Sequence, residues 1–177
     1  MGNSRGFTLV ELMVTLVIIV IITTMAAPSL GNMLTQQKLD TSTRNFTTTL
    51  NQARAQASVL RTTVAVCPNK LATDADFTKE KCAQAAIPEY TATSGSPAAP
   101  VLTAAQKQQV LNTRVYSVVL DPKISVETTS DSFILFNSTG SVSAVKNFRL
   151  CVSGDKRLIT ITRLGIVSQV KNTGVCA

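Results

Sequence analysis

The chain of 177 residues has room for one ordinary domain with an appendage, but not for two full domains. Its residues are 45% hydrophobic and 15% charged, a balance that excludes an intrinsically disordered protein. Lys and Arg outnumber Asp and Glu by 17 to 10, so the formal net charge is +7. The absence of histidine excludes Ser-His-Asp and Cys-His catalysis and zinc sites that use histidine. We therefore expect a protein that is not an enzyme and that needs no cofactor or metal.

The N-terminus combines a short polar segment, residues 1–6, with a long apolar one. Phe7 to Ala27 is a run of 21 residues in which Glu11 carries the single charge. A helix of that length spans roughly 30 Å, the thickness of the hydrocarbon core of a bilayer. Arg5 would stay in the cytoplasm while the bulk of the chain crosses the membrane.

Three explanations of this segment compete. A cleaved secretory signal peptide could end at Met25-Ala26-Ala27, but Pro28 follows directly and Glu11 interrupts the apolar core. A plain signal anchor explains the length of the segment and leaves the glutamate unexplained. A carboxylate in a membrane is costly unless it is paired, so the third explanation gives Glu11 a functional partner.

The sequence Gly6-Phe7-Thr8-Leu9-Val10-Glu11-Leu12 resembles the processing site of type IV prepilins and of type II secretion pseudopilins. The resemblance implies that prepilin peptidase cuts between Gly6 and Phe7, removes residues 1–6 as a leader peptide, and methylates the new amine of Phe7. It also implies that Glu11 pairs with the free amine of a neighbouring subunit during assembly, and that Pro28 kinks the helix. Such a pair would relieve the cost of leaving either charge alone in lipid.

Beyond the transmembrane half at residues 7–28, we expect the helix to continue as an amphipathic half over residues 29–60. Side chains on one face of this helix recur every three or four residues. They are Leu39, Thr43, Phe46, Leu50, Ala53, Ala57 and Leu60. We expect this stripe to pack on the protein's own sheet, and packing against a partner helix is the alternative.

Residues 61–177 are expected to form a β-rich head. Segments rich in β-branched residues and bounded by turn sequences predict strands. These are Thr62–Cys67, Val115–Leu120, Ile124–Glu127, Ser132–Asn137, Phe148–Val152, Arg157–Arg163 and Ile166–Val170. The stretch from Pro68 to Val110 predicts a long surface excursion with a short helix near Thr103–Val110. The predicted fold is α+β, with a long N-terminal α-helix packed on an antiparallel β-sheet head.

Three stretches narrow the resemblance to the GspH/FimT/FimU family of minor pilins. They are Gln52-Ala53-Arg54-Ala55-Gln56-Ala57, Phe136-Asn137-Ser138-Thr139-Gly140, and Arg157 to Gly165. Within the family, FimU-like minor pilins are the most similar. The resemblance implies a type IV pilin-like fold and a structural subunit that helps to initiate pilus assembly at or near the fibre tip. A FimT-like DNA-binding pilin for natural transformation and a GspH-like minor pseudopilin of type II secretion are the alternatives.

The same resemblance implies where the protein is found and what it contacts. Before assembly it would be a single-pass protein of the bacterial inner membrane with its head in the periplasm. There it would contact lipid, prepilin peptidase and the pilus assembly platform. After assembly it would contact other major and minor pilins in the extracellular pilus.

Four cysteines in a head outside the cytoplasm predict two structural disulfides, for which three connectivities are possible. We favour Cys67–Cys82, which would close the base of the excursion, and Cys151–Cys176, which would attach the C-terminus to a central strand. A metal site would need Cys-x-x-Cys spacing, which the chain lacks. We also consider calcium ligation by Asp74, Asp76 and Glu80, and do not favour it.

Basic residues gather near the C-terminus and could neutralise DNA phosphates. The candidates are Lys156, Arg157, Arg163 and Lys171. The favoured interpretation is instead a solvated basic face, or one complementary to a neighbouring pilin. DNA-binding FimT-like pilins carry a Gly-Arg-x-Arg motif, whereas this chain has Gly165-Ile166-Val167-Ser168 at the matching place. Arg157 and Arg163 could still act together, because they share one face of a strand. Ile159 and Ile161 lie between them on that face, which indicates partial burial rather than a phosphate groove.

Overall fold

The computed structural model describes residues 7–92 and 101–176, except for the side chains of residues 25–29. The chain divides into two compact units, Met1–Gln37 and Lys38–Ala177. One helix, α1 (Leu9–Leu60), contributes residues to both units. The predicted start of this helix at Phe7 is two residues too early, because Thr8 caps it.

The first unit contains the N-terminal part of α1, where the described large apolar side chains are exposed. Their exposed fractions run from 49% to 74% between Phe7 and Leu34. Threonine hydroxyls in this part donate hydrogen bonds to carbonyl oxygens of the preceding turn, as Thr15 does to Leu12 and Thr24 to Ile21. Within residues 7–92 and 101–176, no helix has the length and apolar character required to cross a membrane. The spanning role of residues 7–28 stays a prediction.

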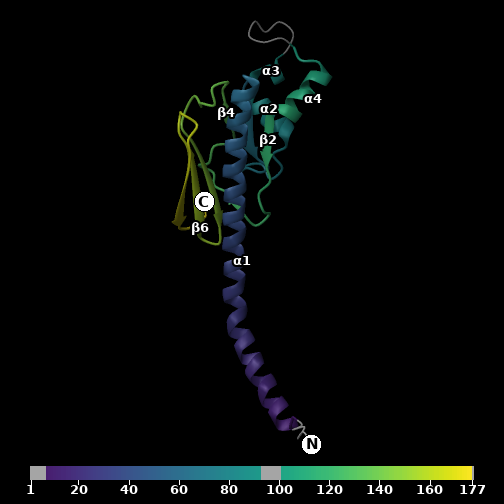
Figure 1. Ribbon diagram of the computed structural model, residues 1–177, viewed down its shortest axis with the longest axis vertical. Coiled ribbons are helices and arrows are strands. Elements are labelled where there is room, and N and C mark those ends of the chain that lie inside the picture. The colour runs from purple at the N-terminus through teal and green to yellow at the C-terminus, as the bar shows by residue number, and fades with distance from the viewer. Residues whose placement is uncertain (1–6, 93–100, 177) are drawn as a thin grey trace, which may run out of the picture. The chain divides into compact units, whose positions relative to one another are not determined.

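The second unit places the remainder of α1 against two β-sheets (Figure 1). The three-stranded sheet has the order β2-β1-β4, formed by β1 (Val64–Pro68), β2 (Val115–Val118) and β4 (Ile134–Phe136). The four-stranded sheet is antiparallel, in the order β3-β5-β6-β7. Its strands are β3 (Ser125–Val126), β5 (Lys146–Val152), β6 (Asp155–Ile161) and β7 (Val167–Thr173). Every predicted strand is therefore present with shifted ends, and the α+β fold with an antiparallel sheet is confirmed. The parallel pairing of β1 with β2 was not predicted.

The predicted stripe of α1 is buried against these sheets. The side chains with no exposed surface are Leu39, Phe46, Leu50, Ala53 and Ala57. Thr43 is 1% exposed, and the Phe46 ring packs on Phe148 of β5 with centroids 4.8 Å apart. Leu60 is the exception: it ends the helix and is 42% exposed. Packing on the protein's own sheets, rather than on a partner helix, is thus confirmed for this face.

The segment from Pro68 to Val110 is not a surface excursion where the structure describes it, so that prediction is wrong. It contains α2 (Lys79–Ala86) and α3 (Pro88–Thr91), and it leads into α4 (Ala104–Thr113), which extends the predicted short helix. Thr78 and Thr103 accept hydrogen bonds from backbone N–H groups of the first turns of α2 and α4. These helices bury apolar side chains in a second core, which includes Phe77, Ile87 and Tyr90.

The reason for this second layer lies in β1, which is buried along its whole length. Val64 and Val66 belong to the core shared with α1, whereas Ala65 and Cys67 belong to the core shared with α2–α4. A strand that is apolar on both faces needs cover on both sides. The continuous apolar run of β1 is therefore the local signal for this second layer, which the prediction of a surface excursion did not include.

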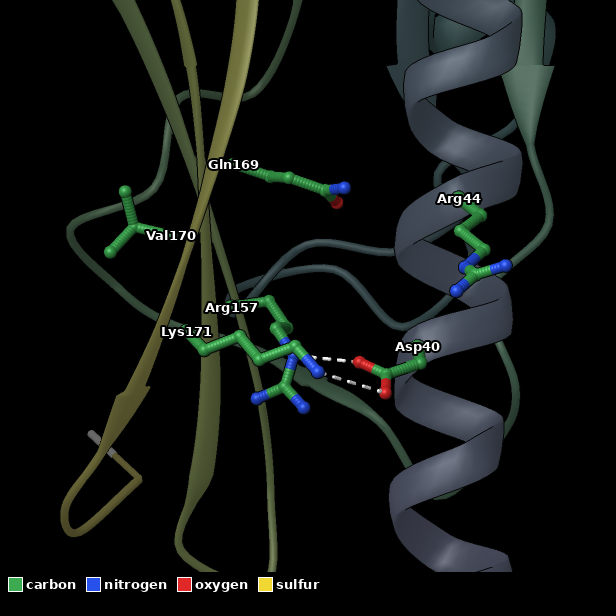
Figure 2. Close-up of a pocket in the computed structure, with 6 residues that line it drawn as sticks. All are labelled: Asp40, Arg44, Arg157, Gln169, Val170 and Lys171. Atoms are coloured by element: carbon green, nitrogen blue, oxygen red, sulfur yellow. Dashed lines mark hydrogen bonds and ion pairs between the residues drawn. The ribbon is translucent and has the colours of Figure 1, made fainter.

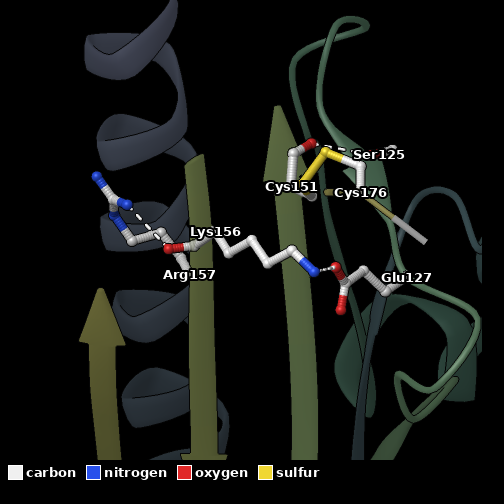
Figure 3. Close-up of a disulfide and its surroundings, with 6 residues drawn as sticks. All are labelled: Ser125, Glu127, Cys151, Lys156, Arg157 and Cys176. Atoms are coloured by element: carbon white, nitrogen blue, oxygen red, sulfur yellow. Dashed lines mark hydrogen bonds and ion pairs between the residues drawn. A yellow bond between two sulfur atoms is a disulfide. The ribbon is translucent and has the colours of Figure 1, made fainter. Parts of the chain in front are cut away.

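Two disulfides fix parts of this unit. Cys67 of β1 is bonded to Cys82 of α2, with the two Cα atoms 6.1 Å apart. Cys151 of β5 is bonded to Cys176 beyond β7, with the Cα atoms 5.6 Å apart (Figure 3). This is the connectivity that the sequence favoured. The first bond joins the second layer to β1, and the second joins the C-terminal segment to the antiparallel sheet.

Candidate functional site

Glu11 lies in the first turn of α1, where the helix dipole favours a negative charge. Its backbone N–H donates a hydrogen bond to the Thr8 hydroxyl oxygen at 3.2 Å, so Thr8 and Glu11 together start the helix. Within the described part of the chain, the Glu11 carboxylate forms no hydrogen bond or ion pair. The carboxylate therefore lies among exposed apolar side chains, and no described residue supplies it with a counter-ion.

The other residues of the predicted processing motif are placed only in part. Gly6 lies outside the described residues, and Phe7 is described with 71% of its surface exposed. Pro28 falls inside α1, but its side chain is not described. Cleavage at Gly6, methylation of Phe7 and a kink at Pro28 stay predictions.

A second group of charged side chains lies between α1 and the antiparallel sheet, around Asp40 (Figure 2). Arg157 of β6 donates a hydrogen bond from Nε to Asp40 Oδ1 at 2.8 Å, and one from Nη1 to the Lys156 carbonyl at 2.9 Å. Lys171 of β7 places Nζ 3.5 Å from Asp40 Oδ2. Arg157 and Lys171 are paired in the β6–β7 register, and alternation along both strands points them towards α1.

Asp40 is the counter-ion that allows Arg157 to be buried. The Arg157 side chain is only 7% exposed, and an unpaired guanidinium at such a site would carry a large desolvation cost. The hydrogen bond from Arg157 holds the pKa of the Asp40 carboxyl below its usual value of 3.8, although burial acts in the opposite direction. Sequence reasoning missed Asp40. Its one local signal is that it is the lone acid between Glu11 and Asp74.

We expect Asp40→Asn to lower the free energy of unfolding near neutral pH by about 2 kcal/mol, because Arg157 stays buried while Asp40 is partly exposed. The lowered pKa of Asp40 implies stabilisation that is present above about pH 4 and lost as the pH falls through the folded-state pKa. Urea unfolding of the full chain in mild detergent, measured across acidic pH, should show this loss in the wild type and less of it in Asp40→Asn. Asp76→Asn, at an exposed site, is the control. If the wild type and Asp40→Asn lost equal stability at acidic pH, Asp40 would not be the counter-ion of Arg157.

The candidate DNA-binding cations are not brought to one accessible surface. Lys156 forms an ion pair with the buried Glu127 carboxylate, on the side of β6 opposite to Arg157 (Figure 3). Arg157 is withdrawn into the core with Ile159 and Ile161, whose burial the strand alternation predicted. Arg163 and Lys171 remain exposed. The structure therefore offers no continuous groove for a phosphate backbone through these four residues.

In the segment after β1, the Asp74 carboxylate is engaged with protein groups. The Asp74 carboxylate accepts hydrogen bonds from Lys81 Nζ at 2.7 Å and from the Asp76 backbone N–H at 3.0 Å. The Lys81 hydrogen bond is the largest cause of the lowered pKa of Asp74. Among the described residues, no group of three His, Cys, Asp or Glu side chains could hold a metal ion.

The three stretches that carry the family resemblance meet at Arg54. A methyl group added to Gly165 would lie 2.2 Å from the Gly140 carbonyl oxygen and 2.9 Å from Arg54 Nε. A methyl group added to Gly140 would lie 3.0 Å from Arg54 Cγ. Both glycines have positive φ angles, of 73° at Gly140 and 75° at Gly165. The turn after β4 and the turn after β6 therefore close around one arginine of α1.

Comparison with known protein families shows that residues 42–165 match the family described as Type II transport protein GspH. The match covers more than half of the chain and includes Arg54, Gly140 and Gly165. The chain belongs to the GspH family. Residues 1–27 also match the prokaryotic N-terminal methylation motif. GspH family members of this kind are pilin-like proteins, so the resemblance to GspH/FimT/FimU-type minor pilins is confirmed. Pilin-like proteins are structural subunits.

One similar solved structure is the type IV minor pilin FimU of Pseudomonas aeruginosa, strain PAO1. The two chains are 14% identical, and the match covers 75% of this GspH family chain and 88% of FimU, with a TM-score of 0.41. No curated protein matches the chain at a significant level.

Proposed function

We propose that this protein is a minor subunit of a type IV pilus. Prepilin peptidase removes residues 1–6 and methylates the amine of Phe7. Residues 7–28 then hold the protein in the bacterial inner membrane, with the head in the periplasm, until the assembly platform moves it into a fibre. It contacts other pilins there, helps to initiate assembly, and takes a place at or near the tip.

The observation that supports this proposal most strongly is the Glu11 carboxylate without a partner in the described chain. Its neighbours along α1 are exposed apolar side chains, and the nearby Thr15 hydroxyl donates its hydrogen bond within the helix, to the Leu12 carbonyl. An anion in such surroundings needs a counter-ion from another molecule. The methylation motif at residues 1–27 supplies a suitable cation, the new N-terminal amine of a neighbouring subunit.

We expect Glu11→Ala to leave membrane insertion and cleavage intact and to lower incorporation into fibres by about tenfold or more, because the neighbour's amine loses its counter-ion. Quantitative immunoblots of sheared fibres, normalised to the amount in whole cells, measure this. Glu80→Ala removes an exposed acid of α2 and is the matched control. Normal incorporation of Glu11→Ala would contradict the pairing role.

Mass spectrometry of the protein from sheared fibres tests the proposed function itself. We expect an N-terminal methylated phenylalanine, which would report both processing and location. A periplasmic form that is free of fibres and trimmed near Pro28 would refute the proposal.

A minor pseudopilin of type II secretion is a second candidate, favoured by the match to the GspH family. It shares the N-terminal motif and the head fold with the pilus subunit. Copurification separates them: a pilus subunit should be recovered with pilus components, and a pseudopilin with secretion components.

A further inference from the structure

The charged group around Asp40 lines a pocket of about 190 Å³ between α1 and the β6–β7 part of the antiparallel sheet. Its walls are formed by Asp40, Arg44, Arg157, Gln169, Val170 and Lys171. In Figure 2 Gln169 and Lys171 extend from β7 towards α1, and Val170 points to the other side of the strand. The pocket opens beside β7, which is an edge strand with exposed side chains.

Cations outnumber anions in this pocket. Asp40 is the one carboxylate of the lining, and it is already shared between Arg157 at 2.8 Å and Lys171 at 3.5 Å. Arg44 follows Asp40 by one helical turn, is exposed, and forms no ion pair with any described residue. Lys171 is 74% exposed and its contact with Asp40 is long. Two of the three cations are thus available to a second anion, while Arg157 is held in place.

The arrangement suits one small carboxylate better than a nucleic acid. A duplex presents a row of phosphates and needs cations spread along a surface. Here Arg44, Arg157 and Lys171 line one pocket of about 190 Å³, which has room for one small anionic group but not for a row of phosphates. Arginine, lysine and amide N–H donors converging on one point are the usual way in which proteins hold a single carboxylate.

We propose that this pocket binds the carboxylate of an aspartate or glutamate side chain on a neighbouring pilin-like subunit. Arg44 and Lys171 make the direct ionic contacts, Gln169 adds a hydrogen bond, and the Arg157–Asp40 pair positions Lys171. The inference rests on the proposed function, because a neighbouring subunit is present only if the chain assembles. The proposal gives the head its own ionic contact with a neighbouring subunit, in addition to the contact that Glu11 makes.

Carbodiimide crosslinking of sheared fibres tests the contact. The reagent joins a lysine amine to a carboxylate without a spacer, so it reports only groups within ion-pair distance. Mass spectrometry should find Lys171 linked to an Asp or Glu of another subunit. The internal Lys171–Asp40 link shows that the reaction has worked, because these groups lie 3.5 Å apart.

Variants then show whether the link depends on the residues of the pocket or only on the positive charge of the head. Arg44→Gln keeps the Lys171 amine and should lower the intersubunit link about threefold to tenfold, while Arg163→Gln, which removes an exposed arginine outside the pocket, should leave it unchanged. Arg44→Gln/Lys171→Gln should lower the share of protein recovered in fibres. Lys79→Gln/Lys123→Gln removes the same charge from exposed sites elsewhere and is the control.

Each outcome decides between the proposals. A Lys171 link to another subunit that weakens in Arg44→Gln supports the pocket. Fibres that contain the protein but yield only the internal Lys171–Asp40 link overturn the pocket and leave the proposed function intact. Absence of the protein from fibres overturns both. If a labelled DNA duplex bound in a way that depends on Arg44 and Lys171, and no intersubunit link formed, the pocket would be a site for DNA phosphate and not for a carboxylate of a neighbouring subunit.

Discussion

Gly165→Ala is expected to destabilise the head by about 3–5 kcal/mol, since it combines backbone strain with a steric clash. The φ angle of 75° at Gly165 is unfavourable for any residue with a Cβ atom. That Cβ atom would also lie 2.2 Å from the Gly140 carbonyl oxygen, a backbone atom that cannot move without shifting its own turn. The turn after β6, the turn after β4 and the Arg54 side chain would all have to separate.

The matched control for this prediction is Gly154→Ala. Gly154 has a similar φ angle of 87°, but the nearest atom to an added methyl group is 3.8 Å away. Its cost should be the backbone strain alone, about 1 kcal/mol. Urea unfolding of the full chain in mild detergent, followed by the fluorescence of Tyr90 and Tyr116, measures both variants. Equal effects of the two substitutions would show that the packing around Arg54 is not the reason Gly165 is required.

Phe46→Ala should lower the free energy of unfolding by about 3–5 kcal/mol. Phe46 has no exposed surface, and it joins α1 to β5 through its ring contact with Phe148. Removing the ring would leave a cavity in the core shared by α1 and both sheets, which the close-packed surroundings can fill only in part.

The same unfolding measurement checks Phe46→Ala against Val59→Ala. Val59 lies on the same helix and is 76% exposed, so truncating it should change the stability by less than about 0.5 kcal/mol. A loss near 1 kcal/mol in Phe46→Ala would mean that the second half of α1 is only loosely held to the sheets.

Much of this fold could be predicted because its signals are local. The repeat of three and four residues from Leu39 to Ala57 is a property of a single helix, and it named the buried face correctly. The β-branched segments marked all the strands, although their ends shifted by a few residues. The processing motif is a contiguous stretch near the N-terminus, and its match to the methylation motif required no knowledge of the fold.

Other features depended on contacts between distant parts of the chain. The second layer formed by α2, α3 and α4 exists because β1 is apolar on both faces and needs cover on both. Nothing in the Ala- and Thr-rich segment itself indicates that it packs on β1. The parallel pairing of β1 with β2 likewise depends on how the intervening helices return the chain.

For this protein, the sequence alone determined the long helix, its buried stripe, the strand segments and the family motif, because each is encoded by neighbouring residues. Only the tertiary structure decided that Arg157 is buried rather than displayed, since its counter-ion Asp40 lies 117 positions away in the chain. The tertiary structure also brought Arg44 and Lys171 to one pocket. Charge can be counted along a sequence, but whether a cation faces solvent or a carboxylate is decided by the packing of a helix on a sheet.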